Sequence, residues 1–519
     1  MNSVKIQLQD EYSTLPSGLY SGESVREMDQ YAIEKLGIDG YDLMNKAARF
    51  SFHVLIKQWP KVQNILVLCG SGNNAGDGYL VAALAKKRGL AAQVLYTSDP
   101  SKLTNDAQSA YQHCLSYKVN CLPYQTDSLL QAAQQSDTVV VDALLGTGLN
   151  KPVTGLFLDA ITTLNTLSLP VVAIDIPSGL SASTGTPLGI AVQASMTATF
   201  IGLKLGLFTG AGRQYCGKIR FSDLALPLDQ FDHITPLALR LDLQVMLRAL
   251  QPRPQDSHKG NHGHLAILGG DLKYGGAVVL AAMAAARMGA GLTSVITQAT
   301  HKQSILAHIP EAMVYCGENF QELSERLQTV DAIVIGPGLG QSAWSEKLLL
   351  CALNSGKQLV LDADALNLIS QKHPKLFTLE TFRKQQHVLT PHPGEAARLI
   401  ETSTRDIQAD RDKSLTQLHQ KWGNHLLLKG SGSLISDSHN RHFLCPYGNP
   451  GMASGGMGDV LSGLIGGLIV QNMAPDRALK LAVCLHAKAA DIVAETSGQR
   501  GLLASDLIPV ARTLLNATH

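Results

Sequence analysis

Short apolar runs alternate with helical stretches along the first 200 residues of the chain. β-branched and other apolar residues cluster at 64–70, 91–97, 137–148 and 170–180, and the segment 78–89 has a helical pattern. Continuous apolar runs of this length are typical of strands buried on both faces, as in parallel sheets covered by helices. The pattern therefore predicts an α/β fold.

A second series of the same kind follows an interruption. Prolines and polar residues at 224–242 and 250–263 indicate a linker. Further strand candidates occur at 264–270, 292–297, 331–340, 358–366, 387–395 and 425–433. The two series show no obvious repeat, so we predict two different α/β domains, residues 1–235 and 236–519. Polar and glycine-rich residues follow the strands in both, and open parallel sheets bind ligands at the carboxyl ends of their strands. We therefore expect one site in each domain.

In the second half, the stretch "SGGMGD" (454–459) directly precedes the apolar run "VLSGLIGGLIV" (460–470). The start of a helix has unpaired N–H groups and a positive potential, and glycines let an anion approach them closely. Asp459 would lie in the first helical turn, where a carboxylate can accept a proton from a hydroxyl that attacks a phosphoryl group. The alternative is a glycine turn in which Asp459 is only the N-cap.

Three further loops favour the phosphoryl-transfer interpretation. "LKGSGS" (428–433) offers Lys429, backbone amides and serine hydroxyls to nucleotide phosphates. "TPHPGE" (390–395) holds His392 and Glu395 between stiffening prolines, and "IGPGLG" (335–340) brings backbone close to a ligand. All three follow predicted strands.

Three motifs in the first half indicate a second binding site. "CGSGNNAGDG" (69–78) ends a strand and begins a helix, and its Asp77 suits ribose hydroxyls or a helix cap. "DALLGTGLNKPVTG" (142–155) and "DIPSGL" (175–180) each begin with an acid at a strand end. Lys151 suits a pyrophosphate. Oxygens from Asn74, Asp142 and Ser178 suit a hard cation.

Composition excludes several classes of protein. Charged residues make up 16% of the chain, the net charge is +1 and aromatic residues are 5%, so we expect no nucleic-acid surface and no membrane-binding patch. The eight cysteines form no CxxC pair, and the first residues show no signal-peptide pattern, so we expect a reducing, cytoplasmic location. His258, His262 and His264 lack the cysteine or carboxylate that would complete a zinc site.

The motifs also resemble known families. Those of the second half resemble the ADP- or ATP-dependent NAD(P)H-hydrate dehydratases of the ribokinase-like superfamily, over about residues 245 to 515. Those of the first half resemble the NAD(P)H-hydrate epimerase domain, over about residues 20 to 225. The whole chain thus resembles a bifunctional NAD(P)H-hydrate repair enzyme, which implies an N-terminal Rossmann-like three-layer sandwich and a C-terminal ribokinase-like α/β domain.

The resemblance implies a pair of reactions on the hydrated cofactors NADHX and NADPHX. The first domain would interconvert their R and S forms, with K⁺ bound, and the second would dehydrate the S form with Mg²⁺ and cleavage of ADP, or of ATP, as co-substrate. We also expect a homo-oligomer. Two alternatives remain open: the second half as a kinase for a small alcohol, and the first half as a binding module without activity.

The resemblance also implies roles for individual residues. Catalytic roles fall to Asp459 and Asp175, and potassium ligation to Asn74, Asp142 and Ser178. Substrate contacts are implied for Asn73, Asn74, Ala75, Gly76, Asp77, Gly146, Thr147, Gly148, Leu149, Asn150, Lys151, Pro152, Asp175, Ala277, Gly340, His392 and Asp459. Nucleotide contacts are implied for Lys429, Gly430, Ser431, Gly432, Ser433 and Gly458.

Two positions depart from the family pattern. Ala75 stands where a glycine is usual, so we expect a strained or shifted loop if that turn needs a positive φ. Asp271 stands where serine is usual.

Overall fold

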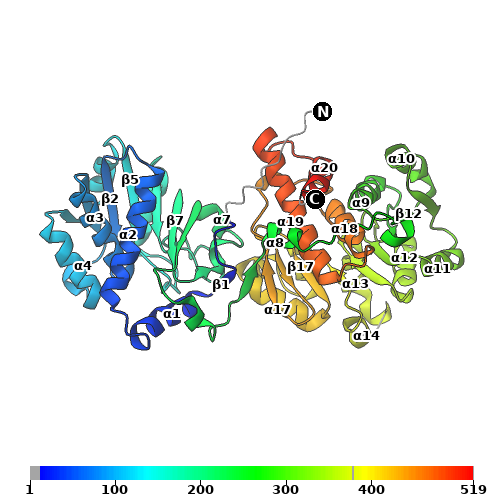
Figure 1. Ribbon diagram of the computed structural model, residues 1–519, viewed down its shortest axis with the longest axis horizontal. Helices are drawn as coiled ribbons and strands as arrows, with labels where there is room; N and C mark the ends of the chain where they lie inside the picture. Colours follow the sequence, from blue (N-terminus) through cyan, green and yellow to red (C-terminus); the bar gives the residue numbers. More distant parts are fainter. Residues whose placement is uncertain (1–11, 377–378, 518–519) are drawn as a thin grey trace. The chain divides into compact units, whose positions relative to one another are not determined.

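The computed structural model describes residues 12–376 and 379–517, which divide into two compact units (Figure 1). One unit comprises residues 15–239, and the other comprises residues from 240 onward together with 12–14. No helix among the described residues is long and apolar enough to cross a membrane.

The N-terminal unit alternates strands and helices as the apolar pattern predicts. Its elements are β1 (Gly18–Tyr20), α1 (Gly22–Glu34), α2 (Gly40–Gln58), β2 (Asn64–Cys69), α3 (Asn73–Lys87), β3 (Ala91–Tyr96), α4 (Asn105–Ser116), β4 (Asn120–Pro123), α5 (Thr126–Ala133), β5 (Thr138–Ala143), α6 (Gly155–Thr166), β6 (Val171–Ile174), β7 (Met196–Phe200), β8 (Leu203–Lys204), α7 (Gly212–Tyr215), β9 (Lys218–Ser222) and β10 (Ala238–Arg240).

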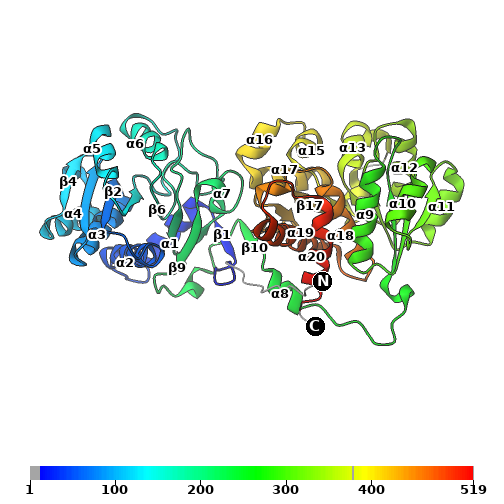
Figure 2. The ribbon, with the colours of Figure 1, turned by 90° about the horizontal axis from the view of Figure 1, so that it is seen from above.

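Seven of these strands form one parallel sheet in the order β4-β3-β2-β5-β6-β7-β9. Side chains alternate between its faces because the period of a strand is two. Val67 and Val141 pack with α2, α3 and α4, whereas Leu66 and Val140 pack with α5 and α6. Figure 2 shows these two helix layers on either side of β2. The result confirms the predicted three-layer α/β architecture.

The small strand β10 matters for where this unit ends. β1 pairs with β10 in antiparallel and with β8 in parallel orientation. A chain cut at residue 235 loses β10 and leaves one edge of β1 unpaired, which destabilises the strand.

We predict that a fragment of residues 15–239 folds on its own, since β8, the two residues of β10 that pair with β1 and the whole seven-stranded sheet lie within it. A matched fragment of residues 15–235 should unfold at a lower temperature in circular dichroism. Equal melting temperatures for the two fragments would show that β10 contributes nothing to this unit.

The C-terminal unit continues the alternation and closes with three helices. Its elements are α8 (Leu243–Arg248), β11 (His264–Leu268), α9 (Gly275–Arg287), β12 (Leu292–Thr297), α10 (Lys302–His308), β13 (Met313–Cys316), α11 (Phe320–Gln328), β14 (Ala332–Ile335), α12 (Ala343–Asn354), β15 (Gln358–Leu361), α13 (Ala363–Leu376), α14 (Leu379–Arg383), β16 (Val388–Leu389), α15 (Pro393–Leu399), α16 (Thr404–Ala409), α17 (Arg411–Trp422), β17 (His425–Leu428), β18 (Leu434–Ser436), β19 (His442–Leu444), α18 (Met457–Ile469), α19 (Pro475–Ser497) and α20 (Ala504–Leu515).

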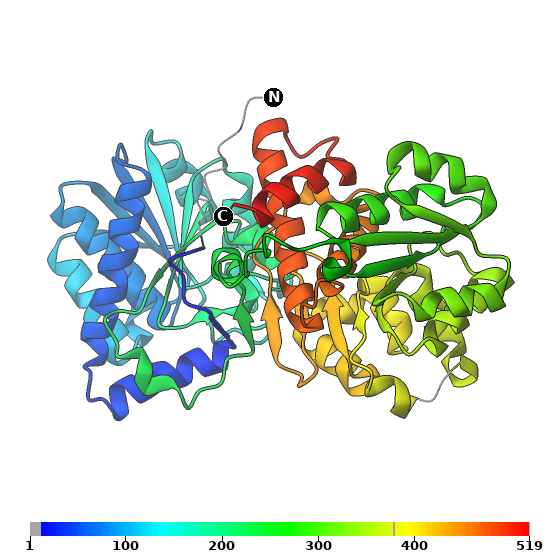
Figure 3. The ribbon, with the colours of Figure 1, turned by 45° about the vertical axis from the view of Figure 1, so that its right-hand side comes forward.

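Its sheet runs β13-β12-β11-β14-β15-β16-β17 in parallel, followed by the antiparallel strands β18 and β19. Helices α9, α18, α19 and α20 pack on one face, against side chains such as Leu265, Val334 and Val360. Figure 3 shows α18 and α19 side by side. The strand order turns at β11 and β14, which brings the loops after these two strands together.

The apolar run that precedes residue 470 forms the central helix α18. Eleven of its thirteen residues are buried. Three of them are glycines, and Gly463 must be one, because a Cβ there would lie 2.2 Å from the carbonyl oxygen of Ala281 on α9. Small residues thus let α18 pack tightly against α9, and this packing fixes the position of its first turn.

Candidate active sites

The first turn of α18 has the arrangement that the glycine pattern predicts. Gly456 is the N-cap, with a left-handed φ of 89° and no side-chain cap bond, and Asp459 is the third helical residue. The alternative interpretation, Asp459 as N-cap, is therefore wrong. Because no side chain caps this end, its N–H groups remain available to an anion.

Four loops of the C-terminal unit meet beside this turn. Lys429 lies after β17, and its Nζ is 2.7 Å from Oδ1 of Asp362, at the end of β15, and 3.9 Å from Oε2 of Glu395 on α15. A Cβ at Gly458 would lie 3.3 Å from Asp362 Oδ2 and 3.4 Å from Lys429 Nζ. The ion pair therefore lies directly against the helix start.

The charges around Asp459 change its acidity. Burial, and then the negative charge of Asp362, raise the pKa of Asp459 to about 7, although Lys429 works in the opposite direction. A carboxyl group with such a pKa is half ionised at neutral pH, which suits a general base.

The remaining loops position the other predicted residues. His392 is the N-cap of α15: its Nδ1 accepts a hydrogen bond from the Gly394 N–H at 2.9 Å, and Glu395 Oε2 accepts one from the His392 N–H at 2.8 Å. The N–H of Gly340 donates to Oδ2 of Asp364 at 3.0 Å. Ala277 lies in the first turn of α9.

A buried arginine, Arg411, stabilises the "KGSGS" loop (429–433) by hydrogen bonds to the backbone at its start. Nη2 of Arg411, on α17, donates to the carbonyl oxygens of Leu428 and Lys429 at 3.0 and 3.3 Å. A Cβ at Gly430 would lie 2.9 Å from Arg411 Nη1. Ser433 closes the loop by donating to the Gly430 carbonyl at 3.0 Å. Ser431 and Gly430 are exposed at its tip.

In the N-terminal unit, the three predicted cation ligands lie in one place. Asp142 is fully buried and accepts hydrogen bonds from Ser178 Oγ at 2.6 Å and from the Ser178 N–H at 2.8 Å. Asn74 donates to the Leu145 carbonyl at 3.1 Å, and Ser178 Oγ also contacts that oxygen. Oδ1 of Asn74 is buried and has no hydrogen-bond partner among the described residues.

The loop from Gly146 to Pro152, which we predicted to bind a pyrophosphate, lies beside the cluster of Asn74, Asp142 and Ser178. Gly146 lies against Asn74, since a Cβ there would be 3.5 Å from the Asn74 Cβ. Thr147 accepts a hydrogen bond at its carbonyl from Arg26 of α1 at 2.5 Å. The rest of the loop is largely exposed: Gly148, Leu149, Asn150, Lys151 and Pro152.

The "NNAGDG" stretch is helical, which corrects two expectations. Helix α3 begins at Asn73 with Gly72 as its N-cap, so Asp77 lies in the second turn and is not a cap. Ala75 is fully buried and is not among the described residues with positive φ, so the expected strain at this position is absent. A Cβ at Gly76 would lie 2.5 Å from Met44 Sδ, so a larger residue there would require Met44 to move.

Asp175 combines an unusual backbone with a buried partner. Its φ is 66°, a left-handed conformation that is uncommon outside glycine and frequent at functional sites. Its carboxylate forms an ion pair with Lys204, whose side chain is fully buried on β8. Lys204 also donates to Thr199 Oγ1 at 2.9 Å and to the Phe200 carbonyl at 3.1 Å.

Two more carboxyl groups face Asp175. Burial raises the pKa of Asp29, on α1, to about 6, with a further contribution from the charge of Asp175. Burial, then Asp175 and Asp29, raise the pKa of Asp77 well above its usual range. This part of the N-terminal unit therefore holds two carboxyl groups with raised pKa values beside one that is paired with a lysine.

The sequence interpretation did not single out Asp362, Lys204 or Arg411. Asp362 ends a predicted strand, as Asp142 and Asp175 do, and this position was a usable signal. Lys204 and Arg411 gave none, because their partners lie 29 and 17 residues away in sequence.

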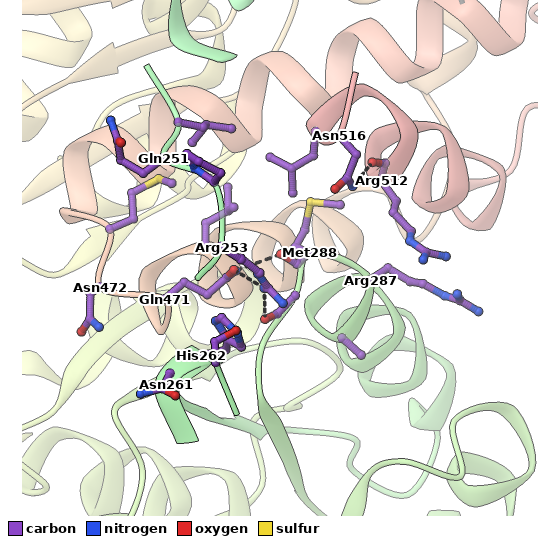
Figure 4. A pocket seen from close by; sticks show the side chains of 18 of the residues that line it. Gln251, Arg253, Asn261, His262, Arg287, Met288, Gln471, Asn472, Arg512 and Asn516 are labelled. Carbon is purple, nitrogen blue, oxygen red and sulfur yellow. Dashed lines mark hydrogen bonds between the residues drawn. The ribbon is translucent and has the colours of Figure 1, made fainter. Parts of the chain in front are cut away.

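A large cavity lies elsewhere in the C-terminal unit (Figure 4). Its volume is about 2250 Å³, and it is lined by residues such as Arg253, Arg287, Met288, Gln471 and Arg512. None of the predicted site residues lines it. Two of its polar groups already bond each other, since Arg253 Nη2 donates to Gln471 Oε1 at 2.5 Å.

A parallel sheet with a glycine-capped helix start, a carboxylate at its third residue and a lysine-bearing loop beside it defines an enzyme of the ribokinase-like, phosphoryl-transfer type. The NAD(P)H-hydrate dehydratase family model matches residues 265–512, and the YjeF-related protein N-terminus matches residues 40–206. The chain belongs to the family of bifunctional NAD(P)H-hydrate repair enzymes.

Individual relatives cover nearly the whole chain. The bifunctional NAD(P)H-hydrate repair enzyme Nnr of Coxiella burnetii is 39% identical over 96% of this chain and 99% of its own length. The Escherichia coli enzyme of the same name is 37% identical over 97% of this chain and 95% of its own length. A solved ADP/ATP-dependent NAD(P)H-hydrate dehydratase from Bacillus subtilis, co-crystallised with ATP and Mg²⁺, is 28% identical, with a TM-score of 0.48 over 54% of this chain and 98% of that one.

Proposed function

We propose that the C-terminal unit dehydrates the S form of NADHX and NADPHX with cleavage of ADP to AMP and phosphate. The observation that carries this proposal is the placement of Asp459: it lies at the third position of an uncapped helix start, with a pKa of about 7. A phosphate resting on the free N–H groups there would face a group able to accept a proton.

The chemistry follows from this arrangement. Hydroxide is a poor leaving group, so the hydroxyl of the hydrate first attacks the terminal phosphoryl group of ADP while Asp459 takes its proton. AMP departs with the electron pair of the broken P–O bond. The new phosphate ester then leaves as phosphate, driven by the lone pair of the ring nitrogen. Loss of a proton from the neighbouring carbon restores the ring double bond.

The loop from Lys429 to Ser433 and Gly458 would bind the nucleotide phosphates, through backbone N–H groups and the lysine ammonium group. A nucleotide bound at this loop would also bring Mg²⁺, which prefers carboxylate, phosphate and water oxygens. The nucleotide phosphates themselves would hold it, with waters completing its coordination. When bound, it would neutralise charge on the transferring group.

We further propose that the N-terminal unit interconverts the R and S hydrates, with Asp175 handling the proton. Epimerisation needs the carbon–oxygen bond to open with help from the ring nitrogen, and water to return on the other face. Asp175 is fixed by Lys204 and keeps 19% of its side chain exposed, so a substrate can reach it. Asn73, Gly76 and the loop from Gly146 to Pro152 would bind the rest of the cofactor.

The cluster of Asn74, Asp142 and Ser178 would hold K⁺. It supplies oxygen donors and one buried carboxylate, and the buried Oδ1 of Asn74 lacks a partner among the described residues, as expected of an oxygen reserved for a ligand. Burial, opposed by the hydrogen bonds from Ser178 and Leu144, raises the pKa of Asp142 to about 6, and a bound cation would favour its ionised form. The ion would orient the substrate-binding loop that passes Asn74.

The potassium proposal predicts the effect of Asp142→Ala. This variant should bind the R hydrate about tenfold or more weakly and lose any rise in melting temperature of the unit on adding K⁺, which binds only the folded state. Dehydration of pure S hydrate should be unchanged. The exposed Asp159→Asn, in the same unit, should retain the potassium effect on the melting temperature. If the wild-type melting temperature is the same in K⁺ and in Na⁺, the proposal is wrong.

The pair of activities can be tested in one assay. A mixture of the R and S hydrates should be converted completely to the reduced cofactor with ADP or ATP, with free phosphate as product. A small-molecule kinase would instead release a phosphorylated alcohol. If the N-terminal unit were only a binding module, conversion would stop at the S half of the mixture.

A further inference from the structure

Asp362 is a buried carboxylate at the centre of the C-terminal site, and the reaction outlined above gives it no role. It follows β15 directly and is 1% exposed. Oδ1 accepts a hydrogen bond from Lys429 Nζ at 2.7 Å, and Oδ2 accepts one from Ser462 Oγ at 2.8 Å. These two partners come from the loop after β17 and from helix α18.

Stability alone does not explain why the charges of Asp362 and Lys429 are buried beside the start of α18. Replacing a buried ion pair with apolar groups is often neutral or stabilising, whereas removing one partner is costly. A Cβ at position 458 would lie in close contact with both Asp362 and Lys429, so the pair packs against the first turn of α18. The ion pair of Asp362 and Lys429, whose burial costs desolvation free energy, thus lies directly beside the turn that carries Asp459.

Both members of the pair remain charged. Burial opposes ionisation of Asp362, but the charge of Lys429 and the hydrogen bonds from Lys429 and Ser462 outweigh it and lower the pKa of this carboxyl group. Burial likewise opposes the charge of Lys429, yet Asp362 and then Glu395 raise the pKa of its ammonium group.

Asp459 faces charged groups from several elements. Asp362 at the end of β15 and Asp364 on α13 raise the pKa of Asp459, and Lys429 lowers it. Glu395 on α15 lies 3.9 Å from Lys429. Burial, and then the charge of Lys429, lower the pKa of His486 on α19 to about 4, so its ring is neutral at pH 7. The charge balance at Asp459 thus depends on where Lys429 is held.

We propose that Asp362 is a positioning residue for dehydration: it anchors Lys429 beside the glycine-lined helix start and acts on Asp459 through that lysine and through its own charge. Without this anchor the ammonium group is free to turn toward Asp459 and hold its carboxylate as an ion pair. The base would then be weaker, and the lysine would no longer be fixed for a phosphate. The inference rests on the proposed role of Asp459 as the base.

The test is Asp362→Asn in the full-length chain, with kcat/KM for dehydration of S hydrate measured from about pH 5 to pH 9. Loss of the Asp362 charge and closer approach of Lys429 both favour the ionised form of Asp459. The acid limb of the profile should therefore move to lower pH, by about one unit. The plateau should fall about tenfold or more because proton affinity and lysine position are both lost.

Ser462→Ala is the matched control. It removes a hydrogen bond to the same carboxylate but no charge, so its acid limb should stay where the wild-type limb lies. Thermal unfolding checks that each variant is folded. If Asp362→Asn gives no folded C-terminal unit, Asp362→Glu, which keeps the charge, should retain the wild-type limb even with a reduced plateau.

The outcomes separate this inference from the proposed function. An unmoved acid limb with a plateau within a few-fold of wild type in Asp362→Asn, or a shifted limb in Asp362→Glu, would overturn the positioning role. If Asp459→Asn itself keeps full dehydration activity, the proposed base is wrong, and this inference fails with it.

Discussion

Replacing Asp459 with Asn should lower the rate of S-hydrate dehydration by about 10²- to 10⁴-fold, the usual effect of losing a general base. This corresponds to about 3 to 5 kcal/mol of transition-state stabilisation. Folding should change little, because Gly456 is the cap of α18 and Asn has the same size as the half-buried Asp459. Nucleotide affinity should hold or improve, since a negative charge near the phosphates is gone.

The pH dependence of the wild-type enzyme gives the same prediction a second readout. A raised pKa means that Asp459 gains its proton as the pH falls through about 7, and the protonated acid cannot act as a base. The kcat/KM for dehydration should therefore fall about tenfold per unit below that pH, and this limb should be missing from the profile of Asp459→Asn. Epimerisation is measured on the same preparation and should be unaffected.

The chain offers a matched control in the same unit. Asp476 is also an acid in the first turn of a helix, and it pairs with Lys480 at 3.2 Å near the surface. Asp476→Asn should keep dehydration within a few-fold of wild type. If Asp459→Asn behaves in the same way, Asp459 does no acid–base work and another group must take the proton.

Replacing Lys204 with Met should abolish most of the epimerase activity, with a loss of about 10²-fold or more. The ammonium group bonds Asp175, Thr199 and Phe200 at once, so its removal leaves the Asp175 carboxylate without its buried cation and beside Asp29 and Asp77. Breaking a buried pair by removing one partner typically costs about 3 to 5 kcal/mol. Part of this cost should appear as a lower melting temperature of the N-terminal unit.

Activity and stability can be separated by two further variants. Lys204→Arg keeps the charge and should recover part of the epimerase rate, whereas a role in packing alone would be served as well by Met. Lys218→Met, at an exposed lysine on β9 of the same unit, should change neither property. Epimerisation by Lys204→Met at the wild-type rate would show that Asp175 does not need its partner. Dehydration of S hydrate should be normal in all three variants.

The sequence located several central strands of both sheets and the loops that follow them. Apolar runs such as 64–70 and 264–270 became the strands β2 and β11, because residues buried on both faces of a sheet must be apolar whatever their neighbours are. The glycine-rich start of α18 could also be predicted, because a helix start without a side-chain cap and with one acid in its first turn is a local pattern. The placement of Asn74, Asp142 and Ser178 at strand ends also followed from order along the chain.

Tertiary structure alone decided the partners and the charges. Asp362 meets Lys429 across 67 residues and Ser462 across 100, and no local pattern encodes such pairings. The pKa of Asp459 depends first on burial, which arises only when α18 packs into the core. Ala75 shows the same limit in reverse: the sequence suggested strain, but helix α3 begins early enough to include this residue in ordinary helical geometry. Local sequence sets conformational preference, whereas desolvation and long-range contacts set proton affinity and position.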